Sequence, residues 1–341
     1  MTLHPIKLRF SFPSKRRHPY LLPFFLPFQG CPERCIFCAQ DQTTGCSSNP
    51  PLLDRLRALQ AQLQKHMTPK PELAFFGGTF TLLDTDSFSA CLSTAHTLRE
   101  AGAITGFRCS TRPDALSPDR LNALAQSGCT CIELGIQSFS DTALAQSRRG
   151  YTGEGAFAAC KSVLAAGFQL GVQLLPGMPG VDADVFVRDV SVAIAAGASM
   201  LRFYPCLVLE GTMLARLFRE GLYQPWTMEQ TIDALAKGYV IAQSNHVPVI
   251  RMGLVLEPSM RILAGPVHPA LGARVKAKAL YLAVLRTLAC AGKQRVYALR
   301  LPASYQGFFW GDCGDMREKW RMMGLEEIVF EKRQDVELFV E

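Results

Sequence analysis

The stretch that decides the fold is F-Q-G-C-P-E-R-C-I-F-C, residues 28–38 of a 341-residue chain. It follows on from an apolar run, Leu21–Phe28, whose composition predicts a buried strand. Gly30 and Pro32 predict a turn directly after this strand. The spacing C-x3-C-x2-C is formed by Cys31, Cys35 and Cys38. Because three thiolates on one short loop can converge on one metal centre, we predict a metal site here.

The number of nearby cysteine and histidine ligands favours an iron–sulfur cluster over zinc at this loop. A zinc site usually has four ligands drawn from two separated pairs, and the sequence has no second C-x2-C pair and no His-x3–5-His pair. A [4Fe–4S] cluster also takes four ligands, so three cysteines leave one iron open for a substrate or cofactor. The alternatives are three structural cysteines, or a structural zinc completed by a distant His or Cys.

Composition bounds the class of protein. With 48% hydrophobic and 19% charged residues the chain can bury a substantial core, which excludes disordered and collagen-like chains. The net charge of +7 is compatible with an acidic partner such as nucleic acid, and equally with a solvated basic surface. No apolar run is long enough to span a bilayer and no secretory pattern is present, so we expect a cytoplasmic protein. The 12 cysteines of so long a chain do not indicate a disulfide scaffold.

Alternating strand and helix patterns surround the cysteine loop. The predicted strands are Leu21–Phe28, Glu72–Phe76, Gly106–Ser110, Thr130–Leu134, Gln169–Leu174 and Met200–Tyr204. The predicted helices between them are Leu52–His66, Asp84–Ala101, Ser117–Gln126, Glu154–Ala166 and Asp184–Ala196. This order predicts an α/β fold, a partial, open (β/α)6 TIM-like barrel with its chemistry at the carboxyl ends of the strands.

Short motifs follow these strands in order. They are F-F-G-G-T-F-T (75–81), S-T-R-P-D (110–114), G-I-Q-S-F (135–139), R-G-Y-T (149–152) and L-P-G-M-P-G (175–180). Together with the cysteine loop they resemble the radical S-adenosylmethionine (radical SAM) enzymes, and among these the radical SAM core of elongator protein 3 and its bacterial relatives. The resemblance covers about residues 20–205. Oxygen-independent coproporphyrinogen dehydrogenases share the skeleton but match S-T-R-P-D less closely.

The resemblance implies cofactors and a reaction. In radical SAM enzymes three cysteines bind a [4Fe–4S] cluster, and its open iron is chelated by the amino and carboxylate groups of SAM. One-electron reduction then cleaves SAM to methionine and a 5′-deoxyadenosyl radical. The resemblance therefore assigns the cluster to Cys31, Cys35 and Cys38. It assigns SAM contacts to Phe37 (adenine), to Gly77, Gly78 and Thr79 (amino group), to Gln137 and Arg149 (ribose and carboxylate) and to Gln173 (ribose side). Ser110 takes a position at which a polar or acidic residue faces SAM in relatives.

The C-terminal third carries a second resemblance. R-M-G-L (251–254) and A-G-P-V-H-P-A-L-G (264–272) resemble the C-terminal extension of bacterial elongator-protein-3-like radical SAM proteins. The predicted elements are helices Thr227–Ser244 and Arg274–Ala291, and strands Val247–Val255, Arg295–Leu299, Glu327–Phe330 and Val336–Val340. We therefore divide the chain into a basic N-terminal extension (1–19), a radical SAM barrel (20–205) and a small α+β cap (206–341).

The catalytic residues are not identified by the sequence. His268, held between Gly-Pro and Pro, is a candidate substrate-binding or proton-handling group, the alternative being a structural histidine. Cys313, in G-D-C-G-D, is a candidate radical quencher or an ordinary loop thiol. Strand alternation leaves open where Arg112 and Glu133 point, and Cys129 and Cys131, which share one strand face, are assigned to packing.

The expected function is reductive cleavage of SAM followed by hydrogen abstraction from an unidentified substrate. The expected partner is a reductant such as flavodoxin or ferredoxin, and the elongator resemblance makes transfer RNA a candidate substrate. No stretch resembles an acetyl-CoA pyrophosphate loop, so acetyl transfer is not expected. The alternatives are a tetrapyrrole-pathway enzyme of the coproporphyrinogen dehydrogenase type and a non-catalytic iron–sulfur binding module.

Overall fold

A computed structural model describes residues 5–8, 10, 20–45, 50–63 and 68–340. Its main body is one seven-stranded sheet in which all neighbouring strands are parallel. In spatial order the strands are β2 (Leu21–Phe25), β3 (Glu72–Phe76), β4 (Phe107–Thr111), β5 (Cys129–Gln137), β6 (Gln169–Leu174), β7 (Met200–Phe203) and β9 (Val249–Met252). Within the described residues, β2 and β9 are the two edges, so the sheet is an open half-barrel and the expected partial barrel is confirmed.

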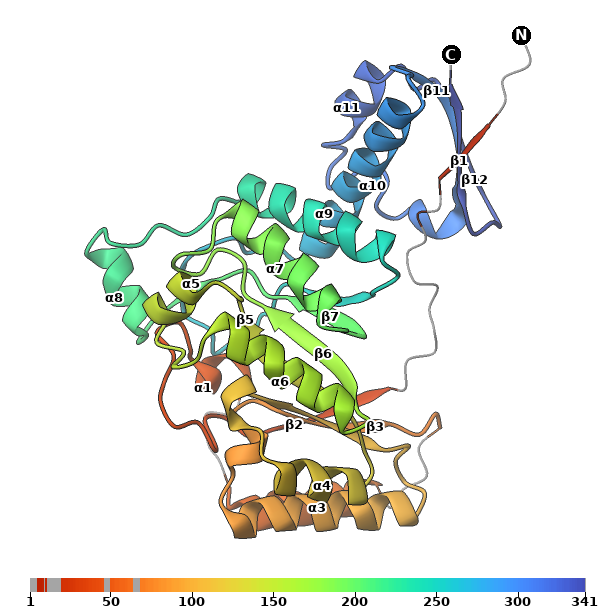
Figure 1. Cartoon of the computed structure of the whole chain (residues 1–341). Helices are drawn as coiled ribbons and strands as arrows, with labels where there is room; N and C mark the ends of the chain where they lie inside the picture. The colour runs from red at the N-terminus through yellow and green to blue at the C-terminus, as the bar shows by residue number, and fades with distance from the viewer. Residues whose placement is uncertain (1–4, 9, 11–19, 46–49, 64–67, 341) are drawn as a thin grey trace.

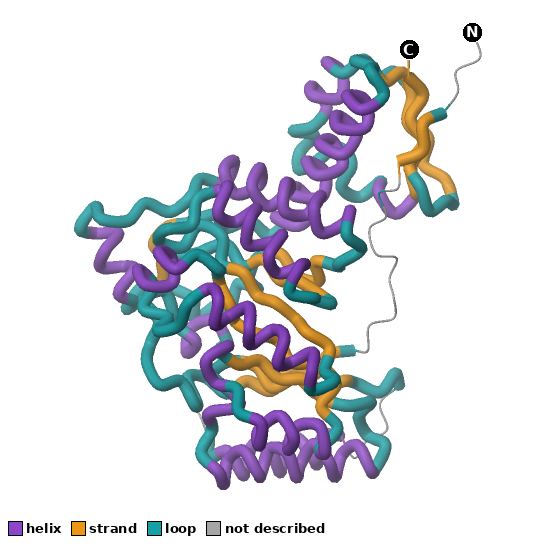
Figure 2. Tube along the Cα trace, viewed as in Figure 1, coloured by secondary structure: helices purple, strands orange, loops and turns teal. Residues whose placement is uncertain are grey.

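Helices connect successive strands and cover the outer face of the sheet (Figures 1 and 2). They are α2 (Leu52–Leu63), α3 (Thr85–Glu100), α4 (Pro118–Gln126), α6 (Gly153–Ala165), α7 (Ala183–Ala195) and α9 (Met228–Ser244). Their starts follow the capping rules: Ser117, for example, accepts a hydrogen bond from the backbone N–H of Arg120, and Pro118 occupies the first helical position. Residues 64–66 of the predicted helix Leu52–His66 lie outside the described residues.

The strands are apolar because both faces of the sheet are covered. In β3 the side chains of Leu73, Ala74 and Phe75 are fully buried. Phe75 stacks on Phe80 with ring centroids 4.8 Å apart, and Phe80 lies just beyond the glycine pair that ends β3. The carboxyl end of β3 is therefore fixed by core packing on both sides of Gly77 and Gly78.

The barrel differs from the prediction in three places. The sheet has a seventh strand, because β9 pairs with β7 and extends the sheet that was predicted to end at Tyr204. The first strand stops at Phe25, and Phe28 already has a left-handed φ of 59°. Helices α1 (Gln40–Thr43), α5 (Asp141–Gln146) and α8 (Met213–Arg219) were not predicted, since each has seven residues or fewer and shows no clear helical period.

The C-terminal region forms a second layer of mixed structure. A sheet of order β1-β13-β11-β12 packs with the helices α10 (Leu271–Cys290) and α11 (Arg317–Met322). Its strands are β1 (Ile6–Leu8), β11 (Val296–Pro302), β12 (Glu327–Glu331) and β13 (Val336–Val340). The chain's first described residues thus supply an edge strand, antiparallel to β13, which composition did not predict. The domain boundaries at 19/20 and 205/206 stay predictions.

Two short strands complete the description. β8 (Val208–Leu209) and β10 (Ile262–Ala264) pair antiparallel in a two-stranded sheet of their own. None of the helices in the described residues has the length and apolar character needed to cross a bilayer.

Candidate cofactor site

A cavity of about 150 Å³ lies at the carboxyl ends of β3, β4, β5 and β6. It is lined by every residue that the sequence assigned to a cofactor. These are Cys31, Cys35, Phe37, Cys38, Gly77, Gly78, Thr79, Ser110, Gln137, Arg149 and Gln173. Motifs separated by more than a hundred residues therefore meet in one place, as parallel strands require. The individual roles given to these residues stay predictions.

The cysteine loop is fastened to the loop that follows β3. The backbone N–H of Thr79 donates to the carbonyl of Gln29 over 2.8 Å. Gln40 Oε1 accepts from the backbone N–H of Gly78 over 2.8 Å and also from that of Phe28. Gln40 was missed by the sequence analysis, and its position two residues after the last cysteine gives no signal for this role.

Gly78 is required by this contact between loops. Its φ is 62°, and a Cβ built on it would lie 2.2 Å from the carbonyl oxygen of Gln29. The same construction on Gly77, with φ 77°, meets nothing closer than 3.5 Å. Gly78 therefore allows the two loops to pack backbone to backbone. Among the described residues, none donates a hydrogen bond to the carbonyl oxygens of Gly77 and Gly78, which can accept from a ligand's ammonium group.

The three cysteines are half-buried free thiols. Burial raises the pKa of Cys38 to about 12, and it raises that of Cys31 despite a 3.4 Å contact between its Sγ and Thr79 Oγ1. A buried thiol becomes a thiolate when a cation compensates its charge, and iron supplies that cation. No three His, Cys, Asp or Glu side chains of the described chain close on a single metal ion. In a cluster each thiolate binds its own iron, so this donor set fits a [4Fe–4S] group better than zinc.

Arg149 ties the R-G-Y-T motif to the cysteine loop. Its side chain is buried, and Nη1 lies 2.9 Å from Sγ of Cys35. Nη2 donates to the carbonyl of Gly135, and Nε donates to the hydroxyl of Tyr151 over 2.8 Å. That hydroxyl in turn donates to the carbonyl of Ile136 over 2.9 Å. All guanidinium nitrogens thus have a partner in the protein, and the SAM contact assigned to Arg149 stays a prediction.

Arg112 is another of the arginines that line the cavity. It forms a fork with Asp114, with N–O distances of 2.9 Å from Nε and 2.7 Å from Nη2, and this pair accounts for the R-P-D of S-T-R-P-D. Nη1 lies 3.9 Å from Cys35 Sγ, and Nη2 donates to the carbonyl of Arg149. The sequence left the direction of Arg112 open, and the structure places it in the cavity wall.

Gln137 sits at an irregular point of the sheet. It has a left-handed φ of 70°, and the pairing of β5 with β6 shifts register between Leu134 and Gln137. A β-bulge with a strained residue is common where a strand directs a side chain into a site. Gln137 therefore points into the cavity that Ser110 and Phe37 also line.

A buried ion network supports the floor of the cavity. Glu133 accepts from Arg202 Nε and Nη2 over 2.6 and 2.9 Å, and from Arg108 Nη1 over 3.3 Å. Arg108 also pairs with Glu72 over 2.6 Å. Burial would raise the pKa of Glu133, but the two arginines and Gln173 lower it below its ordinary value. Gln173 Nε2 donates to Glu133 over 3.0 Å, so this network fixes the orientation of a cavity residue.

Two family profiles match the chain. One, described as the radical SAM superfamily, matches residues 25–191, and one described as a radical SAM C-terminal domain matches residues 198–280. The chain belongs to the radical SAM superfamily. The motifs that line the cavity all lie within the first matched range.

Named relatives match part of this radical SAM protein. A tRNA uridine(34) acetyltransferase of Methanocaldococcus jannaschii is 30% identical over 208 residues, which is 55% of this chain and 38% of that protein. The elongator complex protein 3 of Dictyostelium discoideum is 28% identical over 209 residues, covering 55% and 37%. The matched chain thus spans under two fifths of the length of these relatives. The solved structure of the archaeal Elp3 of Methanocaldococcus infernus superposes with a TM-score of 0.58 at 23% identity, covering 80% of this chain and 63% of that one.

The two catalytic candidates lie outside the cofactor cavity of this radical SAM protein. His268 lines a different cavity, and both of its ring nitrogens have protein partners: Nδ1 accepts from the N–H of Ala270 over 3.0 Å, and Nε2 lies 3.1 Å from Asp312 Oδ2. This arrangement favours the structural alternative for His268. Cys313 is exposed on a turn with a left-handed φ of 51° and lines neither cavity. Cys129 and Cys131 are buried in β5, as packing residues are.

Proposed function

We propose that Cys31, Cys35 and Cys38 bind a [4Fe–4S] cluster, that SAM binds beside it, and that the protein cleaves SAM reductively. The observation that carries this proposal is the meeting of all the assigned residues in one cavity at the carboxyl edge of the sheet. Such a cluster, when bound, supplies the electron that splits SAM into methionine and a 5′-deoxyadenosyl radical, which takes a hydrogen atom from the substrate.

The chain's own residues would bind and orient the cofactor. Arg149 and Arg112 place two positive charges beside the sulfur of Cys35, where they would attract the negative charge of a bound cluster. The carbonyls of Gly77 and Gly78 are placed to accept from an ammonium group. Gln137 and Ser110 line the same cavity and can bond to hydroxyl groups of a ribose.

We further propose transfer RNA as the substrate and a flavodoxin or ferredoxin as the electron donor. The name of the archaeal tRNA uridine(34) acetyltransferase and the chain's net charge of +7 support the RNA proposal. A one-electron donor is required by the chemistry of the cluster. Transfer RNA is tested by its effect on the rate of SAM cleavage, and the electron donor by replacing dithionite with reduced flavodoxin or ferredoxin.

The experiment is anaerobic reconstitution with iron and sulfide, followed by reduction with dithionite in the presence of SAM. We expect methionine and 5′-deoxyadenosine, and neither product from Cys35→Ala. Failure of the reconstituted protein to cleave SAM would exclude the proposed reaction. Addition of transfer RNA should increase the rate in a salt-dependent manner, whereas stimulation by a porphyrinogen instead would favour the tetrapyrrole alternative.

A further inference from the structure

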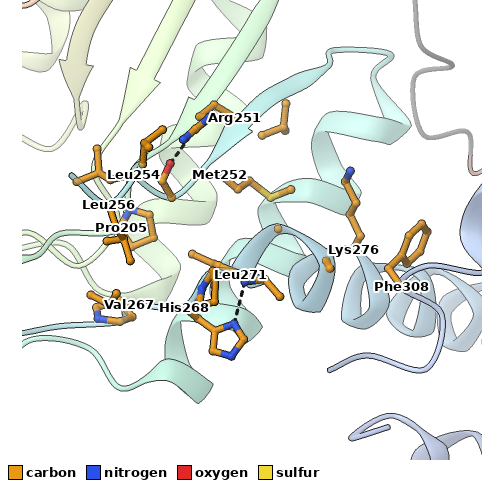
Figure 3. A pocket seen from close by; sticks show the side chains of 18 of the residues that line it. Pro205, Arg251, Met252, Leu254, Leu256, Val267, His268, Leu271, Lys276 and Phe308 are labelled. Carbon is orange, nitrogen blue, oxygen red and sulfur yellow. Dashed lines mark hydrogen bonds between the residues drawn. The ribbon is translucent and has the colours of Figure 1, made fainter. Parts of the chain in front are cut away.

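A cavity of about 650 Å³ lies away from the cofactor site, beside the edge strand β9 (Figure 3). Its walls are β9 and residues 253–256, the loop 266–270, the first turns of α10, and residues 307 and 308. Among the described residues that line it there is no Asp or Glu. Its titratable side chains are Arg251, His268 and Lys276, all basic. A concave surface with charges of one sign favours a ligand of the opposite sign.

Arg251 presents a charge that no carboxylate of the described chain neutralises. Its Nε donates to the carbonyl of Gly253 over 3.1 Å, which fixes the side chain along the strand. Within the described residues no carboxylate forms an ion pair with it. The guanidinium is half-buried, where an anion is bound more strongly than on an open surface. Arg251 is therefore suited to hold an anionic group in the cavity.

Lys276 extends from α10 in the same cavity (Figure 3). It is half-buried, and burial lowers its pKa below the ordinary value. An anion beside the ammonium group would offset that effect. Arg251 and Lys276 thus line the cavity from two different elements, a strand and a helix.

The start of α10 supports the same ligand chemistry. Leu271, Gly272 and Ala273 line the cavity, and the N-cap residue Ala270 has no side-chain cap. The first turn carries no acidic residue, and in the described chain the N–H of Gly272 has no hydrogen-bond acceptor. The positive end of a 20-residue helix therefore faces the cavity with at least one open donor.

His268 lines the cavity and supports the start of α10. Its Nδ1 accepts a hydrogen bond from the N–H of Ala270, and its Nε2 lies 3.1 Å from Oδ2 of Asp312, which is not among the lining residues. The ring therefore fixes the first turn of α10 and leaves ligand binding to the other basic groups.

The rest of the wall is apolar. Met252, Leu254 and Val267 line the cavity, and Val255 and Leu256 at its mouth are 55% and 46% exposed. Exposed aliphatic side chains next to basic groups favour a ligand with both an anionic and an apolar part. A phosphate ester of a planar or apolar group, such as a nucleotide, has this composition.

We propose that this cavity binds the phosphate group of a nucleotide through Arg251, Lys276 and the first turn of α10. The nucleotide is either free or part of an RNA strand. The site is separate from the cofactor cavity, so the proposal does not depend on SAM cleavage.

The test uses a pair of substitutions at Gly272. A Cβ at this position meets only Met252 Cε at 3.8 Å, so Gly272→Ala fits, and Gly272→Asp adds a carboxylate to the mouth of the site. Asp is also favourable in the first turn of a helix, so the variant should not lose stability. AMP and inorganic phosphate are titrated into the full chain by calorimetry at constant ionic strength.

We expect AMP to bind more tightly than phosphate, and Gly272→Ala to bind it within about twofold of the unsubstituted protein. Gly272→Asp and Arg251→Gln should each weaken AMP by about tenfold or more, a loss of about 1.4 kcal/mol. Absence of AMP binding, or equal binding by Gly272→Asp and Gly272→Ala, would overturn the proposal. A short RNA is titrated in parallel: if its affinity falls with that of AMP, the phosphate belongs to RNA, and if only AMP weakens, the ligand is a free nucleotide.

Discussion

Nη1 of Arg149 lies 2.9 Å from Sγ of Cys35, across 114 residues of sequence. The contact joins the R-G-Y-T motif to the middle cysteine of the loop, and Arg112, the residue directly after β4, approaches the same sulfur. Of the three thiols, Cys35 is thus the one at which the structure concentrates positive charge. That asymmetry distinguishes one of the three proposed cluster ligands from the other two.

Replacing Arg149 by Met should have two effects. The carbonyl of Gly135 loses its charged donor, which lowers the free energy of unfolding by about 1–3 kcal/mol. Loss of a positive charge next to Cys35 should also move the reduction potential of the reconstituted cluster to more negative values, because reduction adds negative charge. Denaturant unfolding and a potentiometric titration measure these effects. The matched control is Arg148→Met, a substitution of the exposed neighbouring arginine. Equal changes in stability and in reduction potential for the two variants would contradict the account.

Comparing Gly78→Ala with Gly77→Ala separates the cost of a steric clash between two loops from the cost of a left-handed φ. Both positions have positive φ, so each alanine costs about 1–2 kcal/mol. Only at residue 78 would the new Cβ lie 2.2 Å from a backbone oxygen, which adds about 1–3 kcal/mol of overpacking and displaces the cysteine loop. We therefore expect Gly78→Ala to lose more stability and more bound iron than Gly77→Ala. Indistinguishable variants would show that the loops do not depend on this contact.

Asp189 of α7 should give the protein a pH-dependent stability. It is buried, and its carboxylate accepts from Ser138 Oγ over 2.6 Å and from the N–H of Phe139 over 2.8 Å. Burial raises its pKa from 3.8 to about 6 against those hydrogen bonds. Because the folded pKa is the higher one, this contribution to stability is complete below the unfolded pKa and is lost as pH rises through about 6. Asp189→Asn should remove that slope from unfolding midpoints measured between acidic and neutral pH, and an unchanged slope would refute the assignment.

Glu133→Gln should be among the most destabilising single changes in the barrel. The side chain is buried between Arg202 and Arg108, and the neutral amide leaves both cations undercompensated. We expect a loss of about 3–5 kcal/mol in the free energy of unfolding. Glu326→Gln, at an exposed position, is the control and should change stability by about 0.5 kcal/mol or less. A similar small change at residue 133 would mean that the network contributes little.

The barrel could be predicted because the hydrophobic periodicity of each element agrees with the glycines and capping residues that bound it. Apolar runs such as Glu72–Phe76 end at glycines, and helices such as Pro118–Gln126 carry their own caps, so local pattern and tertiary structure give the same element. Strand β9 was predicted as a strand, but its membership of the barrel sheet depends on pairing with β7, which no local pattern encodes. Strand β1 was not predicted at all. It forms by pairing with β13 at the far end of the chain, and no local pattern encodes that pairing either.

The sequence could predict which residues line the candidate site, but not the hydrogen bonds and side-chain orientations within it. Each motif marks a strand end, and a parallel sheet brings strand ends together, which is why Cys31 and Gln173 share a cavity. Hydrogen-bond partners are a different matter. Gln40 fastens two loops and Arg149 directs its nitrogens at the protein, and both depend on side-chain rotamers that the sequence does not specify.

The central claim is that three cysteines hold a cluster with one iron left for SAM. The most direct measurement is iron and sulfide analysis of the anaerobically reconstituted protein, combined with electron paramagnetic resonance of the reduced sample with and without SAM. The account predicts about four irons per chain and a spectrum that changes when SAM is added. It also predicts that substitution of Cys31, Cys35 or Cys38 by Ala removes the signal, whereas the buried Cys160→Ala retains it. Bound zinc in place of iron, or a cluster spectrum that SAM does not alter, would contradict it.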